Sequence, residues 1–143
     1  MTLKVQVSQV IDRPVAVVFH FYADEHVRNH PRWDPDIHLS RDSDEPLGVG
    51  SIIQRRNTRS GAPVDGTMQV TAFERERLMA ALIHDGPVEM RGSTQFEALG
   101  PSQTRITVTA EIPSLDESAD SAPLKAGMQR SVDNVKRLIE SEL

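Results

Sequence analysis

The stretch Val10-Ile-Asp-Arg-Pro-Val-Ala-Val-Val-Phe-His-Phe-Tyr-Ala-Asp24, which runs on to Pro31-Arg-Trp-Asp-Pro35, decides the fold of this chain. Its first residues are typical of the end of a strand. A helix is then expected to start, because Asp12 offers a capping carboxylate and Pro14 fixes a helical φ. Apolar side chains follow at helical spacing, at Val15, Val18, Phe19 and Tyr22. We therefore expect a short helix here and a second one from Asp24 that ends before Pro31.

The sequence on either side of this stretch predicts strands and one long helix. Leu3, Val5 and Val7 alternate with polar residues, which is typical of a half-buried strand ending near Ile11. Turn-separated strand-like segments then follow, at 37–41, 51–58, 64–73, 78–84, 88–98 and 104–112. Such a succession indicates an antiparallel meander. The C-terminal segment, Pro123 to Leu143, predicts an amphipathic helix whose apolar stripe is Leu124, Met128, Val132, Val135 and Ile139.

Several short motifs occur in a characteristic order: Ile11-Asp-Arg-Pro-Val-Ala-Val-Val-Phe19, Trp33-Asp-Pro35, Val70-Thr-Ala-Phe-Glu74, Gly86-Pro87 and Thr104-Arg-Ile-Thr107. Over essentially the whole chain, they resemble the START-like (SRPBCC) superfamily and its polyketide cyclase/dehydrase branch. This resemblance implies one α+β domain, residues 1–143, with a helix-grip fold. In that fold a curved antiparallel sheet of six to seven strands wraps around the C-terminal helix, and two short helices follow the first strand. Gln103 departs from the pattern, since glycine is common at its position.

Composition excludes several classes of function. The chain has 143 residues, a formal charge of -5 and no cysteine, so it has no disulfide framework. No basic cluster and few aromatic residues are present, which argues against a nucleic-acid partner. We see neither a signal peptide nor an apolar run long enough to span a membrane, and we expect a cytoplasmic protein.

The resemblance implies a ligand cavity between one face of the sheet and the C-terminal helix. Methionines adapt to irregular space, which suits a cavity wall. Gly127 and Ser131 either leave room beneath the helix or allow close helix–sheet packing, and Trp33 either borders the pocket mouth or covers the core. The predicted ligand-binding residues are Phe19, Trp33, Met68, Val70, Leu82, Met90, Thr94, Phe96, Val108, Met128, Ser131 and Val132.

Polar candidates for chemistry are few. Arg56 would orient an oxygen of the ligand if it faced inward, and His84 would titrate at the cavity edge; the alternative for both is an exposed side chain. His26 and His30 would share one face of a helix, but a metal site needs a further ligand. No catalytic-triad signature or phosphate loop is present. We expect no metal and no cofactor.

The sequence leaves three functions open. The leading hypothesis is a protein that binds a hydrophobic, lipid- or polyketide-like small molecule. The alternative is a cyclase/dehydrase-type enzyme acting in the same cavity, and the third is a non-catalytic protein-interaction module. A strand at 37–41, if it lies at a sheet edge, would also permit a homodimer.

Overall fold

The computed structural model describes residues 2–143. Seven strands in this range form one antiparallel sheet. Its strands are β1 (Leu3–Ile11), β2 (Ile37–Ser40), β3 (Ile52–Asn57), β4 (Val64–Glu74), β5 (Leu78–Asp85), β6 (Val88–Gly100) and β7 (Gln103–Ile112). Their order across the sheet is β1-β7-β6-β5-β4-β3-β2. The last strand therefore pairs with the first, with Leu3 opposite Ile112 and Ile11 opposite Thr104, while the other strands follow one another as a meander.

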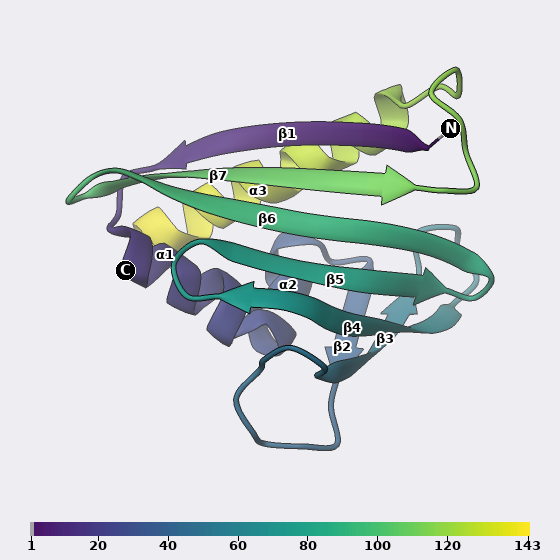
Figure 1. Ribbon diagram of the computed structural model, residues 1–143, viewed down its shortest axis with the longest axis horizontal. Helices are drawn as coiled ribbons and strands as arrows, with labels where there is room; N and C mark the ends of the chain where they lie inside the picture. Colours follow the sequence, from purple (N-terminus) through teal and green to yellow (C-terminus); the bar gives the residue numbers. More distant parts are fainter. Residues whose placement is uncertain (1) are drawn as a thin grey trace.

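The helices all lie on one side of this sheet (Figure 1). Three short segments connect β1 to β2: α1 (Val15–Phe19), a π-helical turn η1 (His20–Asp24) and α2 (His26–Trp33). The long α3 (Ala122–Glu142) runs behind the strands and packs most extensively along β1. This arrangement confirms the expected helix-grip fold.

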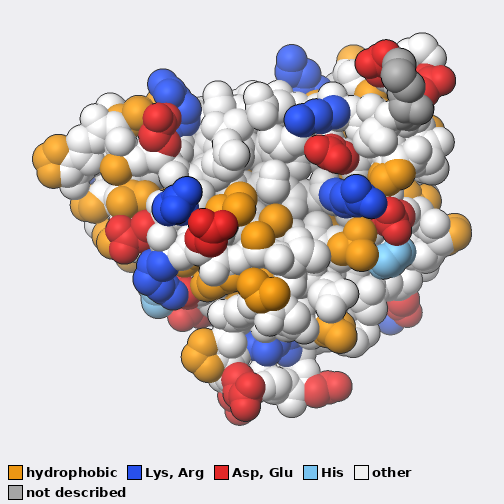
Figure 2. Space-filling model, viewed as in Figure 1, with side chains coloured by type: hydrophobic (Ala, Val, Ile, Leu, Met, Phe, Trp, Pro, Cys, Tyr) orange, Lys and Arg blue, Asp and Glu red, His pale blue; other side chains and the backbone are white. Residues whose placement is uncertain are grey.

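The two faces of the sheet differ in the side chains that they carry. The inner face carries the core, in which Phe19, Ile53, Ile106 and Ile139 are fully buried. The outer face carries interspersed side chains of both signs (Figure 2). Cross-strand pairs such as Arg105–Glu97, at 3.0 Å, occur there. The apolar volume available to a ligand therefore lies on the helix side of the sheet.

The segment between β1 and β2 departs from expectation at both ends. Asp12 does not cap α1; its carboxylate accepts a hydrogen bond from Gln103, and Pro14 precedes the helix without a side-chain cap. The second helix does not end before Pro31 but continues to Trp33. The proline removes only one backbone donor, and the next turn still closes because Asp34 N–H donates to His30 at 2.9 Å.

Contacts outside α2 also hold this last turn in place. Asn29 donates to the Phe21 carbonyl at 2.9 Å, which ties α2 to the π-helical turn before it. Asn134 of α3 donates to the Trp33 carbonyl at 3.2 Å. The extension past Pro31 matters for function, because it brings Trp33 and Asp34 beside the space under α3.

Candidate functional site: a cavity with a polar end

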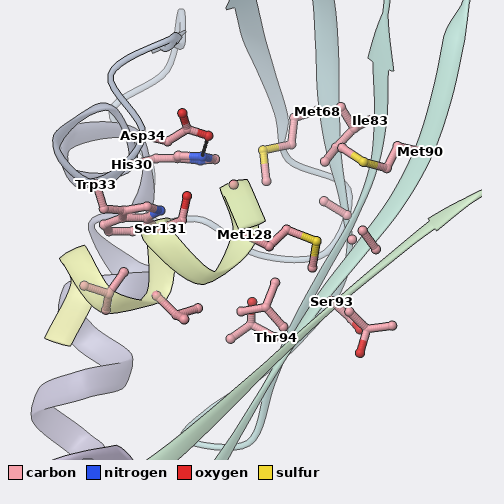
Figure 3. Close-up of a pocket in the computed structure, with 18 of the residues that line it drawn as sticks. His30, Trp33, Asp34, Met68, Ile83, Met90, Ser93, Thr94, Met128 and Ser131 are labelled. Carbon is pink, nitrogen blue, oxygen red and sulfur yellow. Dashed lines mark ion pairs between the residues drawn. The ribbon is translucent and has the colours of Figure 1, made fainter. Parts of the chain in front are cut away.

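A cavity of about 200 Å³ lies between the inner face of the sheet and α3, with α2 at one end. Apolar side chains from strands β4 to β7 and from α3 form most of its wall. Figure 3 shows Met68, Ile83 and Met90 approaching from the sheet and Met128 from α3. At Gly127 an added Cβ would meet only the Arg130 guanidinium, at 3.6 Å. The glycine therefore leaves room beneath the helix rather than permitting close packing.

Most of the residues predicted from sequence to bind a ligand lie in this wall: Trp33, Met68, Met90, Thr94, Val108, Met128, Ser131 and Val132. The others lie elsewhere. Phe19, Val70 and Phe96 belong to the packed core beside the cavity, where the Phe19 and Phe96 rings meet edge to face with centroids 5.0 Å apart. Leu82 lies on the outer face, because its strand partners are Gln69 and Arg91, which are exposed.

The structure also places both polar candidates outside the cavity. Arg56 points outward, with 56% of its side chain exposed, and contacts Asp65 at 2.7 Å. His84 lies on the outer face, 3.4 Å from Glu89. The reason is the register of β3 and β5, in which Ile53 and Ile83 rather than Ile52 and Leu82 face the core.

Arg55, the neighbour of Arg56, is the arginine that faces the cavity. Its side chain is only 4% exposed and contacts both carboxylate oxygens of Asp85, at 2.8 and 3.2 Å. Asn57 donates to the same carboxylate at 3.0 Å. Burial alone would raise the pKa of Asp85, but the hydrogen bonds from Arg55 and Asn57 hold that pKa below its usual value. The guanidinium is thus a fixed, neutralised part of the wall.

A pair of histidines, the buried His26 and the largely buried His30, forms the end of the cavity on α2. His26 Nδ1 lies 2.9 Å from the carbonyl oxygen of Tyr22, and His26 Nε2 lies 2.9 Å from Nδ1 of His30. Burial, which penalises the charged form, lowers the pKa of His26 to about 4 and lowers the pKa of His30 well below its usual value. Both rings are therefore neutral at physiological pH.

Asp34 and Arg59 complete this polar end. The Asp34 carboxylate accepts two hydrogen bonds from Arg59, at 2.9 and 3.1 Å. Its other neighbour is His30, whose Nε2 lies 4.0 Å away (Figure 3). Each guanidinium at this end thus has a carboxylate of its own, because Arg55 is paired with Asp85. Asp36 also lies 3.8 Å from Arg59, so neither guanidinium carries an uncompensated positive charge.

Aromatic stacking positions the histidine pair. The Trp33 ring stacks on Tyr22 on one side, at 4.8 Å between centroids, and on His30, at 5.3 Å. The Tyr22 hydroxyl is hydrogen-bonded to Thr94 at 2.8 Å, and burial raises the pKa of Tyr22 to about 12. Tyr22 therefore stays protonated and supplies a neutral polar group to the wall.

Sequence reasoning did not assign to the cavity several of the polar residues that line it: Tyr22, His26, His30, Asp34, Arg55 and Arg59. It considered His26 and His30 only as metal ligands. A signal was present for four of these residues. Tyr22, His26, His30 and Asp34 are spaced by four, which on continuous helical structure places them along one face. The expected helix end before Pro31 left Asp34 outside this pattern. No signal in the sequence distinguishes Arg55 from Arg56.

No group of three or more His, Cys, Asp or Glu side chains within residues 2–143 could hold a metal ion. None of the helices in the same range is long and apolar enough to cross a membrane.

Comparison with known proteins places the chain in a family. A family model described as "Polyketide cyclase / dehydrase and lipid transport" matches residues 2–140. The chain belongs to this family. The match spans nearly the whole sequence, in agreement with the motifs. A search of curated proteins finds no match.

Solved structures share the fold at low sequence identity. Ara h 8.0201 is 13% identical with a TM-score of 0.77, over 99% of this chain and 100% of its own. A START superfamily protein from Mycobacterium smegmatis is 12% identical with a TM-score of 0.75, over 98% and 99%. Norcoclaurine synthase from Thalictrum flavum, in complex with dopamine and hydroxybenzaldehyde, is 15% identical with a TM-score of 0.69, over 100% and 89%. At these identities the likeness concerns the fold alone.

Proposed function

We propose that this member of the polyketide cyclase/dehydrase family binds a compact, largely apolar small molecule in the cavity beneath α3. The observation that carries the proposal is an apolar wall that ends in a few fixed polar groups, which is the usual composition of a small-molecule site. Burial of apolar surface would supply the affinity. The polar groups near His30 would set the orientation.

The size of the cavity narrows the class of ligand. An apolar cavity of about 150 Å³ takes up benzene, and typical drug-sized sites hold about 300 Å³ or more. At about 200 Å³, this cavity suits a molecule of one or two rings better than a long acyl chain. The norcoclaurine synthase structure holds small aromatic compounds in the same fold, which is consistent with a ligand of this size.

A cyclase/dehydrase-type enzyme is the second candidate. It is favoured by the neutral histidine pair, because a neutral imidazole beside a carboxylate can take up a proton during a reaction. The Tyr22 hydroxyl, which stays protonated, could donate a hydrogen bond to an oxygen of a substrate. Both functions require the same ligand to enter the same cavity, so binding is the first property to test.

The test compares a compact probe with a long one. We expect 2-methoxynaphthalene to bind the purified protein and palmitate to bind much more weakly, as measured by titration calorimetry. Met128→Trp should abolish binding, because the larger ring occupies the cavity between α3 and the sheet. Ala126→Trp is the matched control, since Ala126 is exposed on the same helix and its replacement should leave affinity unchanged.

Native mass spectrometry of freshly purified protein, followed by organic extraction, would identify a ligand carried from the host. No binding of either probe, together with a ligand-free mass, would overturn the proposal and favour a protein-interaction module. If palmitate bound tightly and 2-methoxynaphthalene did not, the proposed ligand class would change from a compact molecule to a lipid. Cytoplasmic location and dimer formation through the edge strand β2 stay predictions.

A further inference from the structure

We propose that His30 Nε2 is the proton-accepting atom of the cavity, and that the site takes an uncharged ligand whose acidic hydroxyl, a phenol or enol, donates to that atom. This inference rests on the proposed function, because it needs a ligand in the cavity. It goes further in naming the atom that recognises the ligand and the chemical group that is recognised.

The hydrogen-bond chain along α2 fixes which nitrogen of His30 carries the proton. A carbonyl oxygen can only accept, so His26 must carry its proton on Nδ1, which faces Tyr22 O at 2.9 Å. The neutral His26 ring then has a lone pair on Nε2. This lone pair accepts from His30 Nδ1 at 2.9 Å. A neutral His30 therefore carries its proton on Nδ1 and its lone pair on Nε2.

The lone pair on His30 Nε2 is the last acceptor in this series of hydrogen bonds, and no described residue donates to it. Figure 3 shows the His30 ring directed toward the methionine side chains of the sheet and of α3. Within residues 2–143, Nε2 makes no hydrogen bond; its near polar neighbour, Asp34 Oδ2, is 4.0 Å away and is itself only an acceptor when ionised. A group that donates a hydrogen bond would satisfy Nε2, whereas an ether or a carbonyl oxygen would leave it unpaired.

The charges around His30 favour an uncharged donor. Arg59 is paired with Asp34 and Arg55 with Asp85, so neither guanidinium has an unpaired charge to offer an anion. The cation that remains on the wall is Arg130, which is exposed on α3 and therefore solvated. A carboxylate buried beside Asp34 would meet a like charge and the lone pair of His30, and both contacts are repulsive.

The neighbours of His30 hold its ring for this contact. Trp33 stacks on it with an interplanar angle of 15°, and His26 fixes its Nδ1 edge. If the ligand transfers its proton fully, the O–H bond breaks, its electron pair stays on oxygen as phenolate or enolate, and an N–H bond forms on His30. The Asp34 carboxylate, 4.0 Å from Nε2, then faces the new imidazolium and offsets part of the repulsion from Arg55 and Arg59.

The experiment uses three probes of the same two-ring shape: 2-naphthol, 2-methoxynaphthalene and 2-naphthoate. Titration calorimetry at pH 7 should show 2-naphthol binding about tenfold more tightly than the ether, the ratio expected for one hydrogen bond gained. 2-Naphthoate should bind most weakly. In His30→Phe, which keeps a ring against Trp33, the preference for the hydroxyl should fall to about one. The matched control His38→Phe, at an exposed position on β2, should retain it.

The possible outcomes separate this inference from the proposed function. Equal affinity for 2-naphthol and its ether in the wild-type protein would overturn the role of His30 while leaving ligand binding intact. Tightest binding of 2-naphthoate would overturn the uncharged ligand. Binding of no probe would overturn the proposed function together with the inference.

A second measurement uses only the wild-type protein, so it tests the inference even if the His30→Phe variant fails to fold. Nitrogen-15 NMR of the wild-type protein at pH 7 should show both His26 and His30 as neutral rings protonated on Nδ1. A proton on His30 Nε2 in the ligand-free protein would overturn the inference, because that atom could then no longer accept one.

Discussion

Arg55 and Arg56 are neighbours in sequence, and each makes a two-point contact with an aspartate, Asp85 for Arg55 and Asp65 for Arg56. They differ in environment, because β3 turns successive side chains to opposite faces. The Arg55 side chain is 4% exposed, whereas that of Arg56 is 56% exposed. The same chemistry thus serves as a structural ion pair on the inner face and as a solvated surface contact on the outer face.

We predict that the two arginines contribute very differently to stability. Arg55→Ala should lower the free energy of unfolding by about 3–5 kcal/mol, because it leaves the carboxylate of Asp85 without its buried partner. Arg56→Ala should lower the free energy of unfolding far less, as is typical of exposed pairs. Urea denaturation of both variants measures the difference. Similar losses in the two variants would show that burial does not separate these pairs.

At the scale of elements, the strands and the long helix could be predicted because their signals are local. Alternation gave the strands, turn residues gave their ends, and the apolar stripe of 124–139 gave α3. It was harder to predict which face of each strand is buried. Adjacent apolar residues, Ile52 with Ile53 and Leu82 with Ile83, supply an apolar side chain to both faces. Only the register against β4 and β6 decides which one is buried.

The second short helix shows another limit of local signals. A proline predicts a helix boundary from the cost of one lost hydrogen bond and a clash. In α2 the turn after Pro31 is retained by contacts from distant parts of the chain, including Asn134 on α3 and the stacking of Trp33 on Tyr22. The polar end of the cavity depends on this turn, so it could not be assembled from local propensity alone.

We predict a stabilising change within α3. Gly127→Ala should raise the free energy of unfolding by about 0.5–1 kcal/mol, because glycine is a poor helix former and the added Cβ meets only the flexible Arg130 side chain, at 3.6 Å. Thermal unfolding checks the direction of the effect. Gly66→Ala is the contrasting variant, since its Cβ would fall 1.6 Å from the His84 carbonyl oxygen and should destabilise the protein. A loss of stability in Gly127→Ala would mean that the space beneath α3 is already filled.

At the scale of the whole molecule, the fold places His26, His30, Asp34, Arg55 and Arg59 together at one end of a largely apolar cavity. The sheet and α3 supply most of the apolar wall, while α2, β3 and the residues just after them supply most of the polar groups. Stacked rings and paired charges keep those groups fixed and neutral. Because the histidines are held neutral in the folded protein, their protonation is coupled to unfolding.

We predict that the protein loses stability in mild acid, well before its carboxylates are protonated. An unfolded histidine has a pKa of about 6.5, whereas burial lowers the pKa of His26 to about 4 and lowers that of His30 as well. Between these values the unfolded chain binds more protons than the folded one, so stability falls as the pH falls. The free energy of unfolding should drop by about 1.4 kcal/mol per pH unit for each buried imidazole that stays neutral.

Urea denaturation between pH 7.5 and pH 4.5 measures this slope. His30→Phe should make it shallower, since the variant has one buried imidazole fewer, while His38→Phe should leave it unchanged because His38 is exposed. Below about pH 4 the contribution of His26 ends, and further loss of stability in all three proteins should come from carboxylates. The pKa of Asp85 is lowered by Arg55 and Asn57, and protonation of that carboxyl group breaks their contacts. If the free energy of unfolding of the wild-type protein did not change between pH 6.5 and pH 4.5, the histidine pair would have to be solvated. The proposal that His30 Nε2 is a neutral acceptor in the cavity would then be wrong as well.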